Sequence, residues 1–111
     1  PGDLATDRRW LLQRRYPPRF VREMGCTEAE WLGWLPGACG ARSVDLAGDA
    51  TAQVSIGEGV LDLNWSPLPD RQIALMRLPR LSVNFSFTAV DEADRERFMR
   101  YFDLFMQRGG G

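Results

Sequence analysis

The densest group of residues that could bind a ligand is a run of arginines, RRWLLQRRYPPRFVR, over residues 8–22. It holds six arginines and no acid. The guanidinium group binds phosphate through two parallel hydrogen bonds, and aromatic side chains stack on bases or insert among lipids. The run therefore predicts binding to nucleic acid or to an anionic membrane surface, and its candidate anion-binding residues are Arg8, Arg9 and Arg22.

A structural role for the same run is the alternative. The chain has a formal net charge of −1, so the residues outside 8–22, with eight arginines and fifteen acids, carry −7. A helix with an arginine-rich polar face can lie against an acidic body of the same chain, and charge runs on helices are usually solvated faces. We favour this interpretation and rank nucleic-acid binding below it.

Several kinds of active site are excluded by the residue types that the chain lacks. All fourteen basic residues are arginine, and there is no lysine or histidine. The chain therefore has no imidazole base or metal ligand, no Schiff-base lysine and no phosphate-loop lysine. Arginine replaces none of these because it stays protonated. We expect no catalytic residue, no metal and no cofactor, although a carboxylate enzyme or small-ligand site between sheet and helix remains a second alternative.

Two tryptophans three residues apart provide the main candidate for protein binding. Trp31 and Trp34 lie in EWLGWLP, which predicts a helix of under three turns with few positions that face a core. An exposed tryptophan is a typical anchor of a protein interface. Burial of both indoles is the alternative, because tryptophan is highly buried on average. The rim of this candidate surface consists of three arginines: Arg14, Arg15 and Arg19.

The two cysteines flank the same predicted helix. Cys26 and Cys39 are too far apart in sequence to form a CxxC motif. The chain has no second pair of cysteines that could complete a zinc site. Nine helical residues would separate them by about 13 Å, whereas a disulfide requires Cα atoms within about 7 Å. We expect two free thiols.

Helical periodicity dominates the first third of the chain. Leu4, Leu11, Leu12 and Tyr16 predict a helix over residues 4–16, which Pro17 and Pro18 end. Phe20, Val21 and Met24 predict a second short helix over 19–24. A capping box, Thr27-Glu28-Ala29-Glu30, begins a third helix that we expect to end near Leu35, before Pro36.

A period of two replaces the helical period from residue 43 onward. Ser43–Leu46 predicts a short strand, and Ala52–Ile56 with Val60–Trp65 predicts a hairpin around Gly57-Glu58-Gly59. We expect a turn over residues 66–70, and then a strand over 72–78 that is covered on both faces because it is nearly all apolar. Leu81, Val83, Phe85 and Phe87 predict a half-buried strand. Between these last two strands we favour a turn at 78–81 over a kink in one long strand.

The last predicted element is a helix over residues 92–108, capped by Asp91. Its apolar face should cover the sheet face of Val83 and Phe85. The chain thus predicts a single α+β domain over 1–111, with a helical part (4–40), an antiparallel sheet of about five strands (42–88) and one long C-terminal helix (91–108).

These patterns favour a small non-catalytic module that binds a protein partner or a second copy of itself. The frequent arginine, glycine, alanine and proline are typical of a GC-rich bacterial source. No stretch has the length and hydropathy of a membrane span, and the first residues lack the pattern of a signal peptide. We therefore expect a cytoplasmic location.

Overall fold

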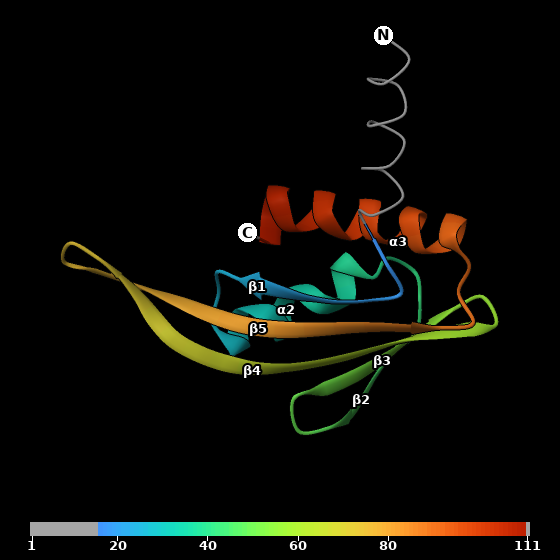
Figure 1. Ribbon diagram of the computed structural model, residues 1–111, viewed down its shortest axis with the longest axis horizontal. Helices are drawn as coiled ribbons and strands as arrows, with labels where there is room; N and C mark the ends of the chain where they lie inside the picture. The colour runs from blue at the N-terminus through green and yellow to red at the C-terminus, as the bar shows by residue number, and fades with distance from the viewer. Residues whose placement is uncertain (1–15, 111) are drawn as a thin grey trace, which may run out of the picture.

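A computed structural model describes residues 16–110, which form an antiparallel sheet with helices on one face (Figure 1). The strands are β1 (Arg19–Met24), β2 (Val44–Gly48), β3 (Thr51–Ile56), β4 (Gly59–Ile73) and β5 (Met76–Thr88). Their order across the sheet is β1-β5-β4-β3-β2. The helices are α2 (Glu28–Ala38) and α3 (Glu92–Phe105), which continues into a π-helical turn, η1 (Met106–Gly110). The α+β class and the five antiparallel strands agree with the sequence.

The core lies between the sheet and the two helices. The inner sheet face is formed by alternate residues of β4 and β5, and Val83 and Phe85 are almost fully buried. Phe102 of α3 meets the ring of Phe85 edge-on at 5.5 Å between centroids, and it lies 6.0 Å from Trp31 of α2. The prediction that the terminal helix covers the sheet is therefore confirmed.

Helix α2 begins as predicted but continues further. The capping box is formed, because the Glu30 amide donates to the Thr27 hydroxyl at 3.1 Å and the Thr27 amide donates to the Glu30 carboxylate at 3.0 Å. The helix passes through Pro36 and ends at Ala38, so the predicted end near Leu35 is wrong. The Cys39 amide still donates to the Leu35 carbonyl at 3.1 Å, which completes the last turn.

The short helix predicted over residues 19–24 is wrong, because this segment is strand β1. It pairs with β5 from Arg19↔Ser86 to Met24↔Leu81. Phe20 turns inward and stacks on Phe85 at 4.7 Å, whereas Val21 points outward and is exposed. Apolar residues at 20, 21 and 24 fit a helix, but a strand also accommodates them when residue 22 faces inward. The helix predicted over 4–16 lies, except for Tyr16, outside the described residues.

The turns predicted at 66–70 and 78–81 are also wrong. Strands β4 and β5 are single long strands that pair from Val60↔Thr88 to Ile73↔Met76, with a bulge between Leu68 and Arg71. The strand runs on through Pro79, as in the less favoured alternative, but it begins at Met76. The strand predicted over 72–78 is wrong in its bounds, because the chain reverses at Ala74 and Leu75. Proline fits here because these parts of β4 and β5 are sheet edges, where an amide donor is not needed.

The remaining elements follow the sequence closely. The β3–β4 hairpin reverses at Gly57, whose φ of 59° suits glycine. Asp91 caps α3 by accepting a hydrogen bond from the Asp94 amide at 2.8 Å, and Arg100 pairs with Glu96 at 3.6 Å. Within residues 16–110, no helix has both the length and the apolar character to cross a bilayer.

Candidate functional site

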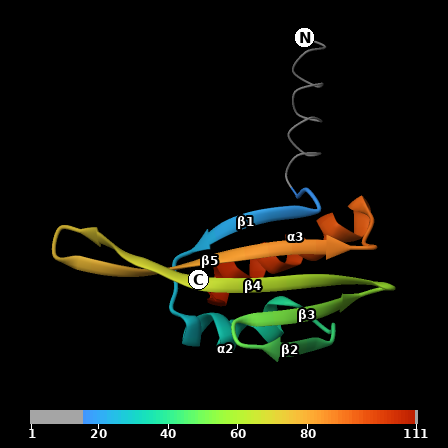
Figure 2. The ribbon, with the colours of Figure 1, turned by 60° about the horizontal axis from the view of Figure 1, so that its bottom comes forward.

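A two-stranded arm projects from one end of the sheet (Figures 1 and 2). The pairing of β4 with β3 ends at Asn64, and the pairing of β5 with β1 ends at Leu81. Residues 66–80, which we call the arm, therefore have strand partners only on β4 or β5, and the outer edges of both strands are free there. The arm reverses at Ala74 and Leu75, where Ala74 takes a φ of 54°. The arm exposes both of its faces, so its side chains are the most accessible part of the sheet.

The arm has one apolar face and one polar face near its end. Residues directly opposite each other in an antiparallel pair project to the same side. The pairs Ile73↔Met76 and Arg71↔Leu78 thus share one face, and the intervening pair Gln72↔Arg77 occupies the other. We call the exposed apolar residues of this end the apolar tip: Ile73 (51% exposed), Leu75 (100%), Met76 (62%) and Leu78 (36%).

The apolar tip corrects the prediction for residues 72–78. The sequence indicated a strand covered on both faces, but no part of the described chain covers this one. A cluster of exposed large apolar residues is uncommon on a protein that acts alone, so the apolar tip is a candidate contact surface. Sequence analysis missed this surface because it placed the apolar run inside the core.

Three prolines restrict how the arm can bind. Pro67 and Pro69 lie on β4 and Pro79 lies on β5, all within the part of the sheet that has free edges. Proline has no amide donor, and natural proteins use it to block the addition of strands at an edge. Contact through the apolar side chains is therefore favoured over strand addition.

An ion-pair cluster holds the base of the arm against strand β1. Arg80 contacts the Glu23 carboxylate at 3.0 Å, and Arg71 contacts its other oxygen at 3.5 Å. The Arg80 Nε also donates to the Pro69 carbonyl at 2.8 Å, which links the two strands of the arm. Exposed ion pairs add little stability, so this cluster contributes only a small free energy to the contact between the arm and β1.

The tryptophan candidates occupy different environments. Trp31 is fully buried and meets Trp65 edge-on at 5.6 Å, so it has no surface to offer a partner. Its Nε1 has no hydrogen-bond partner among the described residues. Trp34 is half-buried. Arg19 is exposed on β1, whereas Arg8, Arg9, Arg14 and Arg15 lie outside the described residues.

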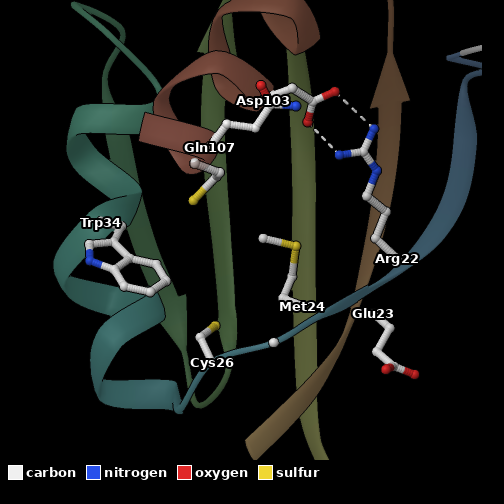
Figure 3. Close-up of a pocket in the computed structure, with 9 residues that line it drawn as sticks. Arg22, Glu23, Met24, Cys26, Trp34, Asp103 and Gln107 are labelled. Atoms are coloured by element: carbon white, nitrogen blue, oxygen red, sulfur yellow. Dashed lines mark hydrogen bonds and ion pairs between the residues drawn. The ribbon is translucent and has the colours of Figure 1, made fainter. Parts of the chain in front are cut away.

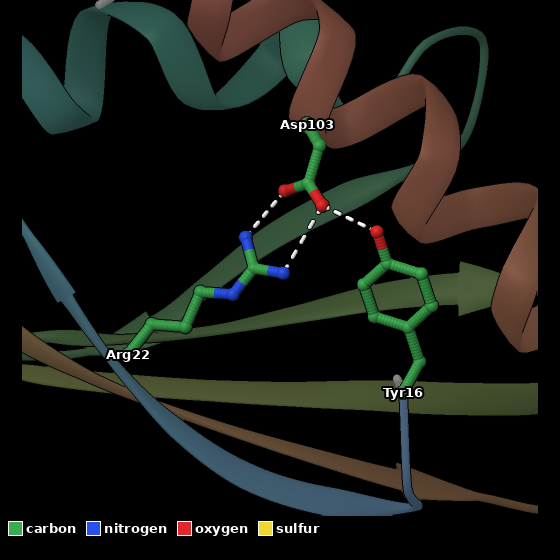
Figure 4. Close-up of polar contacts among 3 residues, drawn as sticks. All are labelled: Tyr16, Arg22 and Asp103. Carbon is green, nitrogen blue, oxygen red and sulfur yellow. Dashed lines mark hydrogen bonds and ion pairs between the residues drawn. The ribbon is translucent and has the colours of Figure 1, made fainter. Parts of the chain in front are cut away.

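Arg22 faces into the protein, where Asp103 of α3 binds it (Figure 4). Arg22 Nη1 donates to Asp103 Oδ1, and Nη2 donates to Oδ2 at 3.0 Å. The Tyr16 hydroxyl donates to the same Oδ2 at 2.6 Å. Burial lowers the pKa of Arg22, but the hydrogen bond and charge of Asp103 raise it, and the net pKa lies above the ordinary value. The guanidinium group thus ties β1 to α3.

A groove of about 400 Å³ lies beside this cluster, where β1, α2 and η1 meet (Figure 3). Arg22 and Asp103 form one wall, and Trp34 lies opposite them. Met24 and Met106 add apolar surface. Its carboxylates at Glu23 and Asp103 are already held in ion pairs. Among residues 16–110, no three Cys, Asp or Glu side chains come together as a possible metal site.

The two cysteines are unpaired, as predicted, and both are buried. Burial raises the pKa of the Cys26 thiol. Burial raises the pKa of Cys39 to about 12, from an ordinary value of 9.0, against a smaller lowering by Arg42. Both groups are therefore protonated thiols at neutral pH, which are poor nucleophiles and poor metal ligands.

The raised pKa of Cys39 predicts a loss of stability in alkali. Above pH 9 the unfolded chain releases the thiol proton while the folded chain keeps it, so the free energy of unfolding falls as the pH rises toward 12. We expect a decrease of roughly 1 kcal/mol per pH unit from this group. Urea unfolding of the wild type and of Cys39→Ala between pH 8 and 10.5 measures it. Parallel pH profiles for the two proteins would contradict the prediction.

No protein-family model, no curated protein and no solved structure matches this chain.

Proposed function

We propose that this protein is a non-catalytic binding module that contacts a partner protein through the apolar tip of its arm. One observation carries the proposal: four large apolar side chains lie together, outside the core, at the end of a projecting hairpin. Each exposed apolar surface costs free energy in water, and a partner that covers it recovers that free energy. An arm that extends beyond the domain is accessible to such a partner.

The chemistry of the tip favours a protein over a nucleic acid. Proteins that bind single strands combine a basic groove with aromatic stacking platforms, and the arm contains no aromatic residue. Aliphatic side chains and methionine adapt well to apolar pockets of another protein. Binding of anions through residues 8–22 stays a prediction, because most of that run lies outside the described residues.

Photochemical crosslinking tests the proposal in the full chain. A photoreactive amino acid at Leu75 should form adducts of defined mass with a protein in the producing cells. The matched control is the same group at Glu58, an exposed residue in the β3–β4 turn at the other end of β4. Adding Ile73→Asp and Met76→Asp should abolish the adduct formed at position 75. The two new carboxylates would have to lose their water in an apolar contact, which costs free energy.

Two results would contradict a protein-binding arm. One is the absence of adducts at position 75, and the other is equal labelling at positions 75 and 58. Adducts with lipid or nucleic acid alone would replace the proposed class of partner.

A further inference from the structure

An apolar hollow lies away from the arm, between the second half of α2 and strand β2. Its volume is about 300 Å³, at the lower end of the range of about 300–1,000 Å³ that is usual for small-ligand sites. We call it the α2–β2 hollow. Its walls are aliphatic, and Gly40 and Arg42 complete the lining: Leu32, Leu35, Pro36, Val44 and Leu46. Among the described residues that line it, Arg42 is the only charged one.

We propose that the α2–β2 hollow binds a small alkyl carboxylate, whose carboxylate pairs with Arg42 and whose alkyl chain lies between α2 and β2. The hollow and the arm share no residue, so this inference goes beyond the proposed function and does not depend on it. Covering an alkyl chain with aliphatic walls is favourable in water. One guanidinium group balances the charge of one carboxylate, which selects a ligand with a single acidic group.

The guanidinium group of Arg42 brings an unpaired positive charge to the hollow. It lies over the ring of Phe98 of α3, 5.2 Å from the ring centroid, and it makes no ion pair or hydrogen bond with any of residues 16–110. A cation over the face of a ring uses none of its N–H donors for that contact. The edge of the guanidinium group can therefore bind a carboxylate through two parallel hydrogen bonds.

Gly40 leaves space beside this guanidinium group. A Cβ atom at Gly40 would lie 3.7 Å from Arg42 Nη1, and both residues line the hollow. The Nη1 donor thus lies at the end of the hollow that Gly40 borders. Gly40 has a φ of 70°, a conformation that side chains rarely adopt, so the same backbone turn also keeps this end free of a side chain.

The carboxylate nearest in sequence on β2 faces away from the hollow. Val44 lies opposite the buried Val54, whereas Asp45 lies opposite the exposed Gln53. Residues opposite each other project to the same side, and neighbours along a strand project to opposite sides. Asp45 therefore projects from the other face of the sheet and does not compete with a ligand for Arg42.

The end of α2 opposes an anion only weakly. The carbonyl groups in the last turn of a helix carry partial negative charge, which disfavours a nearby anion. Here the Leu35 carbonyl accepts from the Cys39 amide and the Gly37 carbonyl accepts from the Gly40 amide, each at 3.1 Å. These hydrogen bonds offset part of that charge, and the full charge of Arg42 exceeds what is left.

The lining favours an alkyl chain over the carboxyl terminus of a peptide. A bound peptide needs partners for its amide and carbonyl groups, and burying such groups unpaired costs free energy. Arg42 is the only polar side chain in the described lining, and the ligand carboxylate occupies it. An alkyl chain makes no such demand.

Three probes with the same alkyl chain and different head groups test the proposal: decanoate, decanol and decylamine. Each is titrated into the full chain by calorimetry at neutral pH, below its micelle concentration. Decanoate should bind about tenfold or more tightly than decanol, because a hydrogen-bonded charge pair contributes more than about 1.4 kcal/mol. Decylamine should bind most weakly, since Arg42 repels its ammonium group.

Variants assign the effect to the hollow. Arg42→Gln should reduce the affinity for decanoate to that for decanol and leave the affinity for decanol unchanged. Leu46→Asp, at a wall residue that is 59% exposed, should also weaken decanoate binding about tenfold by repulsion. The matched control is Arg97→Gln, which removes the same charge from an exposed position on α3 and should have no effect. Circular dichroism checks that each variant is folded, and Leu46→Asp decides if Arg42→Gln is not.

Four results would overturn the proposal. They are the absence of decanoate binding, equal affinities of the wild type for decanoate and decanol, equal losses in Arg42→Gln and Arg97→Gln, and tighter binding of an acetylated tripeptide that ends in leucine. The last would make a peptide carboxyl terminus the ligand. None of these results bears on crosslinking at position 75, which tests the arm by itself.

Discussion

Phe102→Ala should lower the free energy of unfolding by about 3–5 kcal/mol, as large deletions from a packed core do. The side chain is fully buried and contacts three aromatic rings that come from the sheet, from α2 and from α3 itself: Phe85, Trp31 and Phe98. Its removal leaves a cavity where the three elements meet. Since domains are stable by only about 5–15 kcal/mol, the variant should be close to unfolding.

Leu104→Ala on the outer face of α3 is the control for this prediction. Leu104 is about half-exposed, so the change removes little buried surface and should cost less than about 1 kcal/mol. Urea unfolding followed by tryptophan fluorescence measures both variants. Similar losses for the two would show that α3 does not cover the sheet through Phe102.

Gly59→Ala should lower the free energy of unfolding by about 3 kcal/mol, at the upper end of the cost of overpacking. A Cβ atom at Gly59 would lie 2.2 Å from the Ala89 carbonyl oxygen and 2.5 Å from that of Thr88. Both are backbone atoms at the end of β5, so neither can move aside as a flexible side chain would. The turn would have to move away from the end of β5.

The neighbouring glycine of the same turn is a matched control. Gly57 has a φ of 59°, but no atom lies within 4 Å of the position that its Cβ would take. Gly57→Ala therefore costs only the left-handed backbone conformation, about 1–2 kcal/mol. Thermal and urea unfolding compare the two variants. A smaller loss for Gly59→Ala than for Gly57→Ala would contradict the close approach of β4 to the β5–α3 junction.

Elements with a local signal were predictable from the sequence. The capping box at Thr27 and the cap at Asp91 fixed the starts of α2 and α3, and strict alternation at Val83 and Phe85 identified the buried face of β5. These signals depend on hydrogen bonds or burial within a few residues. The class of fold followed from them.

Strand β1 was not predictable because its local pattern is ambiguous. Phe20 and Met24 are four residues apart, a spacing that fits the same face of a helix or of a strand. The decisive contacts are distant in sequence: Phe20 stacks on Phe85, and Arg22 pairs with Asp103. Such contacts override a weak helical preference.

The candidate site was missed because Pro67, Pro69 and Pro79 were interpreted as turns. Each also fits a sheet edge, where no amide donor is required. The position of the three prolines could have identified the arm, because they lie on both sides of the apolar run. Prolines on both strands of a hairpin are typical of a sheet edge that is protected from strand addition. The run itself, around Ile73 and Met76, was correctly seen as apolar and wrongly placed in the core.

The most direct test of the account uses the two isoleucines of the chain as reporters. Ile73 lies in the apolar tip, and Ile56 lies buried in β3 as an internal control. Selective δ1-methyl labelling gives one NMR signal from each. When a clarified protein extract of the producing cells is titrated in, the account predicts that the Ile73 signal shifts and broadens as a partner protein covers the apolar tip, that the Ile56 signal stays constant, and that Leu75→Asp suppresses the change. An Ile73 signal that keeps one position and width at every addition would contradict it.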